Sequence, residues 1–169
     1  LGMQLVGIAE NAGNIVHGII PEGKNLATCA AKIEALHRSN PAQAENTLFG
    51  YMPDCDGDRG NIIYWDEAQQ KALILEAQEV FALSVIAELS YLHYRGNIGA
   101  PLAVTVNGPT SLRINEIAKA LDAEVFYAEV GEANVVNRAE DARRYGYTVR
   151  ILGEGSNGGN ITYPAAVRD

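Results

Sequence analysis

The sequence has few cysteines, no long uninterrupted apolar segment and a deficit of basic side chains. Cys29 and Cys55 are too few for a disulfide scaffold and too isolated for a zinc site, so we expect a reducing, cytoplasmic environment. The longest apolar stretch, Val80 to Leu92, is interrupted by two serines and a glutamate and is therefore no membrane span. These absences exclude disulfide-rich and membrane-spanning classes of protein.

The charge balance is acidic. Thirteen basic and 21 acidic side chains give a formal net charge of −8 at pH 7. This balance is unsuited to binding nucleic-acid backbones or anionic membranes, which depend on basic patches, so we expect neither kind of partner. An acidic chain can still bind phosphate at one local site, through a metal ion or backbone amides.

The length and composition are those of a small globular protein. A chain of 169 residues fits one domain, or two if one of them is incomplete. The content of 47% hydrophobic and 20% charged residues argues against a disordered chain. The N-terminus lacks the basic region and cleavage site of a signal peptide. Because the chain begins within a pattern and stops at Arg168-Asp169 directly after a strand-like run, we expect an excerpt of a longer protein.

Strand and helix patterns alternate along most of the chain. Short apolar runs predict strands over Thr47–Met52, Ile62–Trp65, Leu102–Val106, Glu124–Val130 and Thr148–Leu152. Apolar residues at helical spacing predict helices over Ala27–Leu36, Glu76–Arg95, Pro109–Leu121 and Glu132–Arg144. Alternating strands and helices predict an α/β fold with a mainly parallel or mixed sheet. The polar run Asp66–Gln70 separates two such systems, so we divide the chain into residues 1–66 and 67–169.

An acidic loop lies between the first two predicted strands. Its carboxylates Asp54, Asp56 and Asp58 alternate in a tight turn and can point at one hard cation with oxygen ligands. Their mutual repulsion requires a counter-charge, and Arg59 offsets only one of the three. A calcium EF-hand is excluded, because its sixth position is Arg59 instead of glycine and its twelfth is Trp65 instead of glutamate. A solvated turn and a purely structural cation site remain alternatives.

A second polar loop, Gly153–Asn160, directly follows the last predicted strand. Its four glycines allow close backbone approach, and Glu154, Ser156 and Asn157 supply donors and acceptors that suit sugar hydroxyls. We expect the Glu154 carboxylate to lie on an exposed loop. The segment lacks the Lys-Ser/Thr pair and the glycine order of nucleotide phosphate loops. A long flexible loop without a ligand is the alternative.

Together the two loops resemble those of the α-D-phosphohexomutase superfamily, the phosphoglucomutase/phosphomannomutase enzymes. The magnesium loop of that family reads Asp-Gly-Asp-x-Asp-Arg, which residues 54–59 match with Cys55 and Gly57 at the spacer positions. Its sugar loop reads Gly-Glu-x-Ser-Gly-His or Gly-Glu-Gly-Asn-Gly-Gly, and residues 153–159 are similar to both with one extra residue. The segments 107–118 and 130–135 are similar to a strand–turn–helix and a Val-Gly turn of the family.

The resemblance implies a magnesium-dependent mutase that interconverts hexose 1-phosphate and hexose 6-phosphate through an enzyme phosphoserine. It assigns Mg²⁺ binding to Asp54, Asp56 and Asp58, a catalytic role on phosphoryl oxygens to Arg59, and binding of the phosphorylated hexose to Glu154, Ser156 and Asn157. It also implies the end of the second and most of the third of four domains. The first and fourth domains of the polypeptide, with the phosphoserine, would lie outside this chain, and the chain alone would be inactive. Because Cys55 and Asn157 depart from the family pattern, a non-catalytic phosphosugar- or metal-binding module remains the alternative.

The predicted turn between Asn107 and the following helix allows two interpretations. Its amides could bind an anion, or Thr110 and Ser111 could cap the helix, and we favour capping. We expect Arg113 and Arg138 to lie on exposed helix faces.

Overall fold

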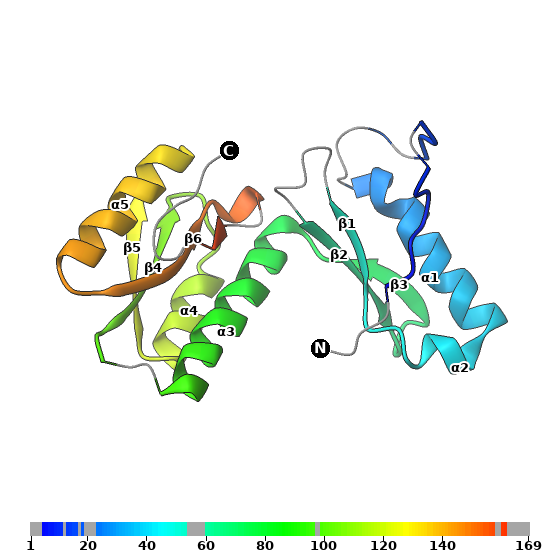
Figure 1. Cartoon of the computed structure of the whole chain (residues 1–169), viewed down its shortest axis with the longest axis horizontal. Coiled ribbons are helices and arrows are strands. Elements are labelled where there is room, and N and C mark those ends of the chain that lie inside the picture. The colour runs from blue at the N-terminus through cyan, green and yellow to red at the C-terminus, as the bar shows by residue number, and fades with distance from the viewer. Residues whose placement is uncertain are drawn as a thin grey trace. The chain divides into compact units, whose positions relative to one another are not determined.

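The computed structural model describes residues 5–11, 13–16, 18, 23–53, 60–96, 99–157 and 160–161. The chain divides into two compact units, Leu1–Ile74 and Leu75–Asp169 (Figure 1). The first unit runs to Ile74, because residues 71–74 form a strand that pairs with the strand before them. The assignment of residues 1–66 and 67–169 to parts of two domains stays a prediction. None of the helices in these ranges is long and apolar enough to cross a membrane.

The first unit packs one main helix against a small antiparallel sheet. Its elements are η1 (Gly23–Leu26), α1 (Ala27–Ser39), α2 (Pro41–Ala44), β1 (Gly50–Pro53), β2 (Gly60–Asp66) and β3 (Lys71–Ile74). The strand order is β1-β2-β3, and both pairs are antiparallel. Parallel strands need a long crossover, and the connections between these strands are too short for one. Leu26, Cys29 and Ile33 pack with Ile63 of β2 to form the core of this unit.

Cys29 is part of that core, and the residue is 6% exposed. Burial raises the pKa of the Cys29 thiol above its ordinary value, so the reactive thiolate is scarce at neutral pH. In a Cys55→Ser variant, which leaves Cys29 as the one cysteine of the sequence, we expect Ellman's reagent to react roughly tenfold or more slower in buffer than in urea. Equal rates in the two solvents would contradict the buried position of this side chain.

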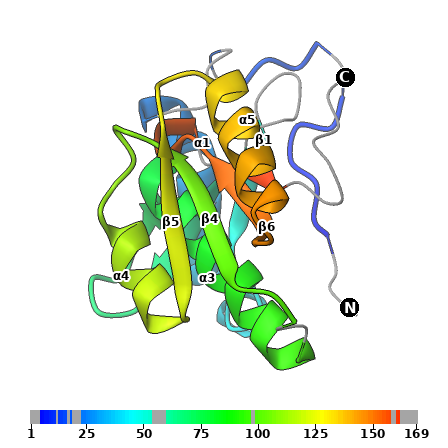
Figure 2. The same cartoon turned by 90° about the vertical axis from the view of Figure 1, so that its left-hand side faces the viewer.

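The second unit is a three-layer α/β structure. Its elements are α3 (Ala77–Arg95), β4 (Leu102–Asn107), α4 (Arg113–Ala120), β5 (Ala123–Ala128), α5 (Glu132–Arg144), β6 (Thr148–Gly153), η2 (Gly155–Asn157) and β7 (Asn160–Ile161). The strand order is β5-β4-β6-β7, of which Figure 2 labels β5, β4 and β6. β5, β4 and β6 are parallel and β7 is antiparallel to β6, which confirms the prediction of an α/β fold with a mainly parallel or mixed sheet.

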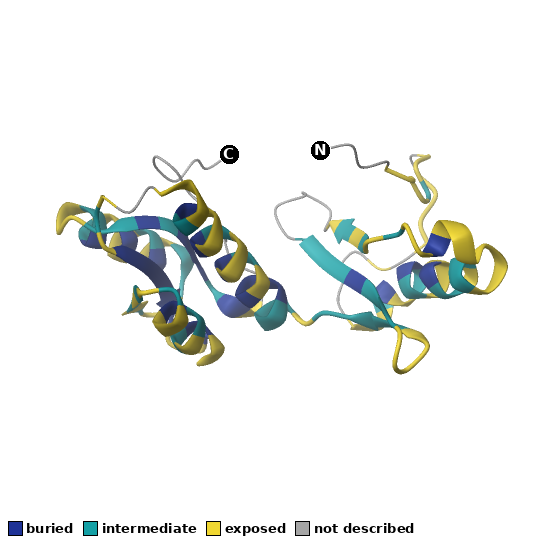
Figure 3. Cartoon of the chain, turned by 90° about the horizontal axis from the view of Figure 1, so that it is seen from below, coloured by how far each residue is buried: buried dark blue, intermediate teal, exposed yellow. Residues whose placement is uncertain are grey.

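The two faces of this sheet are covered by different helices. All six residues of β4 are buried, because β4 lies between β5 and β6 and has helices over both faces (Figure 3). Leu102, Val104 and Val106 pack with α3 and α4 on one face. Ala103 packs with α5 on the other, where Ala139 is fully buried. The residues of β4 therefore belong to the hydrophobic cores on both faces of the sheet.

The ends of α3 and two exposed arginines show how polar groups are placed on the helices of this unit. α3 begins with a capping box between Glu76 and Glu79, and its C-cap is Gly96, whose φ of 65° is left-handed. Arg113 is exposed and lies 3.4 Å from Glu79, and Arg138 is exposed with its guanidinium 5.2 Å from the centre of the Phe126 ring. Both arginines therefore lie on exposed helix faces, as expected.

Candidate functional site

The carboxyl ends of β4, β5 and β6 bring together residues that are distant in sequence. Asn107 ends β4, Gly131 follows β5, and Glu154 directly follows β6. β4 and β6 are neighbours in the sheet. From β4 the chain continues to β5 on one side of this pair, and from β6 it continues to β7 on the other side. In open α/β sheets, ligands bind outside the carboxyl ends of strands at such a reversal of strand order. The predicted sugar loop thus begins at the place where this fold class binds ligands.

Asn107 and Gly131, which lie near this reversal, both donate hydrogen bonds to the Glu154 side chain. Its Oε1 accepts a hydrogen bond from Asn107 Nδ2 at 2.8 Å and another from the Gly131 backbone N–H at 2.7 Å. Asn107 is 2% exposed, and Glu154 itself is half-buried. The expectation of an exposed carboxylate is therefore wrong, because Asn107 at the end of β4 and Gly131 in the turn after β5 hydrogen-bond this half-buried side chain.

Thr110 connects the end of β4 to the residue after Glu154. Its Oγ1 donates to Asn107 Oδ1 at 2.6 Å and accepts from the Gly155 backbone N–H at 3.0 Å. The capping role predicted for Thr110 is therefore wrong, because its hydroxyl is engaged with the sugar loop and with β4. Ser111 Oγ accepts from the Arg113 N–H at 3.3 Å. The N-cap of α4 is Leu112, and the helix has no side-chain cap hydrogen bond, so the capping role predicted for Ser111 is wrong as well.

A further contributor to this site, Gln78, was not identified from the sequence. It lies in the first turn of α3, where its Oε1 accepts from the Ser111 N–H at 2.9 Å and its Nε2 donates to Pro109 O at 3.2 Å. Gln78 thereby holds the turn that carries Thr110. A single glutamine near a helix start carries no sequence signal for this contact, because its partners lie more than 30 residues away.

The Gly155 position leaves no room for a side chain. A Cβ there would clash with Gln78 Oε1 and would lie 3.0 Å from Thr110 Cγ2. Gln78 cannot move away without giving up its bond to Ser111 N. We expect Gly155→Ala to lower the free energy of unfolding by about 1–3 kcal/mol, measured by urea denaturation.

The matched control for that substitution is Gly108→Ala. Gly108 is exposed, and a Cβ there would meet nothing within 4 Å. We expect it to change the free energy of unfolding by no more than roughly 0.5 kcal/mol. Equal effects of the two substitutions would show that the Gly155 contacts do not constrain the loop.

The other predicted site residues are less fully described. Ser156 is exposed in η2, and Asn157 ends this element, with its side chain outside what the structure describes. The predicted metal ligands and the catalytic arginine, residues 54–59, lie outside the described residues between β1 and β2 and stay predictions. Within the described ranges, no three His, Cys, Asp or Glu side chains are placed to share a metal ion.

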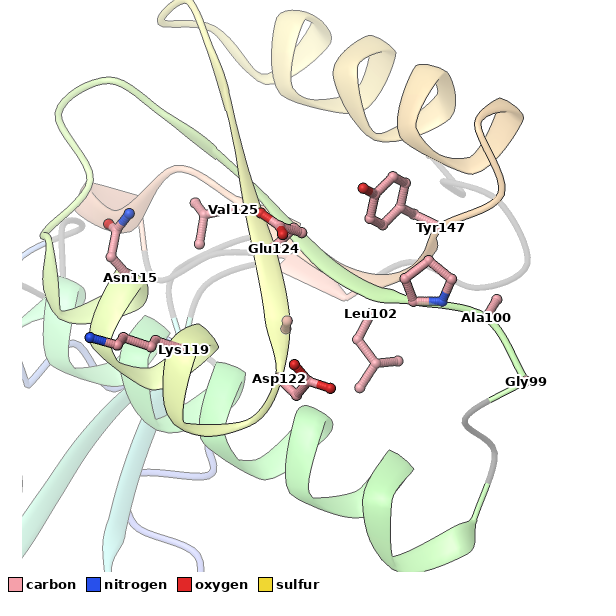
Figure 4. A pocket seen from close by; sticks show the side chains of 11 residues that line it. Gly99, Ala100, Leu102, Asn115, Lys119, Asp122, Glu124, Val125 and Tyr147 are labelled. Atoms are coloured by element: carbon pink, nitrogen blue, oxygen red, sulfur yellow. The ribbon is translucent and has the colours of Figure 1, made fainter.

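A pocket of about 680 Å³ opens at the opposite, amino end of β4 and β5 (Figure 4). Its polar lining includes Asn115 and Lys119 from α4, and Asp122 and Glu124 from the start of β5. Figure 4 shows Lys119 and Asp122 pointing away from each other, so their charges do not converge on one ligand group. We therefore place the candidate site at the carboxyl ends of the strands, where the polar groups do converge.

The fold of this chain matches parts of larger solved structures. A candidate phosphomannomutase from Thermus thermophilus matches with a TM-score of 0.56 and 19% identity, over 88% of this chain and 28% of its own. A phosphoglucomutase/phosphomannomutase family protein from Burkholderia thailandensis matches with a TM-score of 0.55 and 18% identity, over 83% of this chain and 25% of its own. N-acetylphosphoglucosamine mutase from Aspergillus fumigatus, solved with GlcNAc-6P and magnesium, matches with a TM-score of 0.50 and 17% identity, over 79% of this chain and 26% of its own.

These matches show the fold, which is that of a part of α-D-phosphohexomutase structures. The chain spans about a quarter of the length of these proteins. No protein-family model and no curated protein matches the sequence.

Proposed function

We propose that this chain is part of a phosphosugar mutase that interconverts hexose 1-phosphate and hexose 6-phosphate. The observation that carries the proposal is the position of Glu154, which is held at the reversal of strand order in a fold found in several phosphohexomutase structures. The phosphoryl group would come from a phosphoserine outside residues 1–169. The protein would act as an intramolecular phosphotransferase in the cytoplasm, and the chain by itself would be inactive.

The sugar is the ligand for the loop that follows β6. Glu154 accepts hydrogen bonds, and Ser156 both donates and accepts them, so that together with Asn157 they complement hydroxyl groups, which also do both. A mutase must bind its bisphosphorylated intermediate in two orientations. Side chains that bind sugar hydroxyls in both orientations of the intermediate suit this requirement better than a site that binds one phosphate position.

The acidic loop of the first unit is the proposed place for Mg²⁺. Three carboxylate donors fit a hard cation that prefers oxygen ligands, so Asp54, Asp56 and Asp58 would hold it. When bound, the ion would supply positive charge that offsets the charge of the transferring phosphoryl group. Arg59 would bind and orient phosphoryl oxygens beside it, because a guanidinium forms paired hydrogen bonds with phosphate.

The proposal is tested with the full-length protein that contains this chain. We expect conversion of glucose, mannose or N-acetylglucosamine 1-phosphate to the corresponding 6-phosphate in the presence of Mg²⁺, followed by a coupled assay or ³¹P NMR. We expect residues 1–169 alone to give no turnover above that of an Asp58→Ala control. A full-length protein without activity on any of the three sugars would refute a mutase function, and turnover by the chain alone would place the catalytic group within it.

A further inference from the structure

We propose that Asn107 and Thr110 are positioning residues, which orient Glu154 and the following backbone for the sugar. This inference rests on the mutase function proposed above. Neither side chain needs to touch the ligand, because Asn107 is 2% exposed and Thr110 is 5% exposed. Both act through the loop residues that they hold, Glu154 and Gly155.

The donors and acceptors in the hydrogen bonds of Asn107 and Thr110 can be assigned in one way only. The Gly155 N–H is a donor, so Thr110 Oγ1 must accept from it and direct its own proton to Asn107 Oδ1. The Asn107 amide is thereby oriented with its Nδ2 towards Glu154 Oε1. The Gly131 N–H meets the same oxygen, so the side chain at position 154 must present an acceptor there.

Three consecutive hydrogen bonds connect two neighbouring residues of the sugar loop through residues at and just after the end of β4. The Gly155 N–H bonds Thr110, Thr110 bonds Asn107, and Asn107 bonds Glu154. Gln78 of α3 braces the turn that carries Thr110 by bonding Ser111 N and Pro109 O. The end of a fully buried strand therefore sets both the backbone direction of the loop and the orientation of its carboxylate.

Precise orientation matters for a residue that binds substrate. A small misplacement of a binding group lowers the rate strongly, since catalysis depends on geometry held before the reaction begins. Loss of the Thr110 hydroxyl leaves the Gly155 N–H and Asn107 Oδ1 without their partner and frees the amide to turn. The proposal therefore predicts a kinetic defect that operates through Glu154.

The test compares Thr110→Val with Thr110→Ser in the full-length protein. Valine has nearly the shape of threonine but no hydroxyl, whereas serine keeps the hydroxyl. We expect Thr110→Val to lower kcat/KM for the hexose 1-phosphate by roughly tenfold. We expect Thr110→Ser to keep most of the kcat/KM of the parent. In a Glu154→Gln background, we expect Thr110→Val to lower kcat/KM further by less than about threefold, because both changes affect the same group.

A second variant covers the case in which Thr110→Val does not fold. Asn107→Asp keeps the acceptor for Thr110 but replaces the donor to Glu154 by a carboxylate oxygen, so we expect a kinetic loss at least as large. Melting temperatures of all variants are measured in parallel.

Four outcomes would overturn the proposal. Additive effects of Thr110→Val and Glu154→Gln would give Thr110 a separate structural role. If the kinetic losses of the Thr110 and Asn107 variants only follow a fall in melting temperature, both residues have a structural role alone. An active parent enzyme that is insensitive to both variants would refute the positioning role and leave the mutase function intact, whereas an inactive parent would refute the two together.

Discussion

Asp56→Asn in the full-length protein is expected to lower mutase turnover by roughly 100-fold or more at limiting Mg²⁺. Three carboxylates at alternate positions repel one another, and a hard cation relieves that repulsion. The amide removes one charge and weakens the affinity for the ion. The stability of the metal-free protein should change little or increase, because one of three like charges is removed.

The measurement is kcat as a function of Mg²⁺ concentration, with the melting temperature determined in the presence of a chelator. Glu45→Gln is the matched control, because Glu45 is an exposed carboxylate of the same unit that belongs to no predicted site. Normal turnover of Asp56→Asn at limiting Mg²⁺ would show that Asp56 is no ligand. A large loss of stability without metal would instead assign the loop a structural role.

Glu154→Gln is expected to reduce kcat/KM by roughly tenfold or more, since about 1.4 kcal/mol of transition-state binding corresponds to one decade. The carboxylate can accept hydrogen bonds from sugar hydroxyls, and the amide replaces one acceptor by a donor. The glutamine retains one oxygen, which can still receive the bonds from Asn107 Nδ2 and Gly131 N. These bonds become weaker without the charge, so we also expect stability to fall by about 1 kcal/mol.

Glu129→Gln is the matched control for that experiment. Glu129 is an exposed carboxylate just after β5, and no predicted site includes it. We expect this variant to keep the kinetics and the melting temperature of the parent. If Glu154→Gln has unchanged kinetics, or a loss that a large fall in melting temperature explains, then Glu154 is a structural residue of the loop.

Local patterns determined most elements of the second unit. The bounds of α5, residues 132–144, agree with those predicted, because apolar residues at helical spacing and a basic last turn mark it. α3 ends before Gly96, because the left-handed backbone conformation at the end of this helix favours glycine. In the first unit β3 was missed, since a four-residue strand after a polar turn has too few residues for a periodic signal.

The organisation of the candidate site depended on contacts that no local pattern contains. The sequence identified Glu154 by its glycine-rich setting and by resemblance, but placed it on an exposed loop. Its bond to Asn107 joins residues 47 positions apart and exists only because β4 and β6 are neighbours in the sheet. Thr110 has the same local surroundings whether it caps a helix or binds a loop, and only the tertiary fold brings the Gly155 N–H within reach of its hydroxyl.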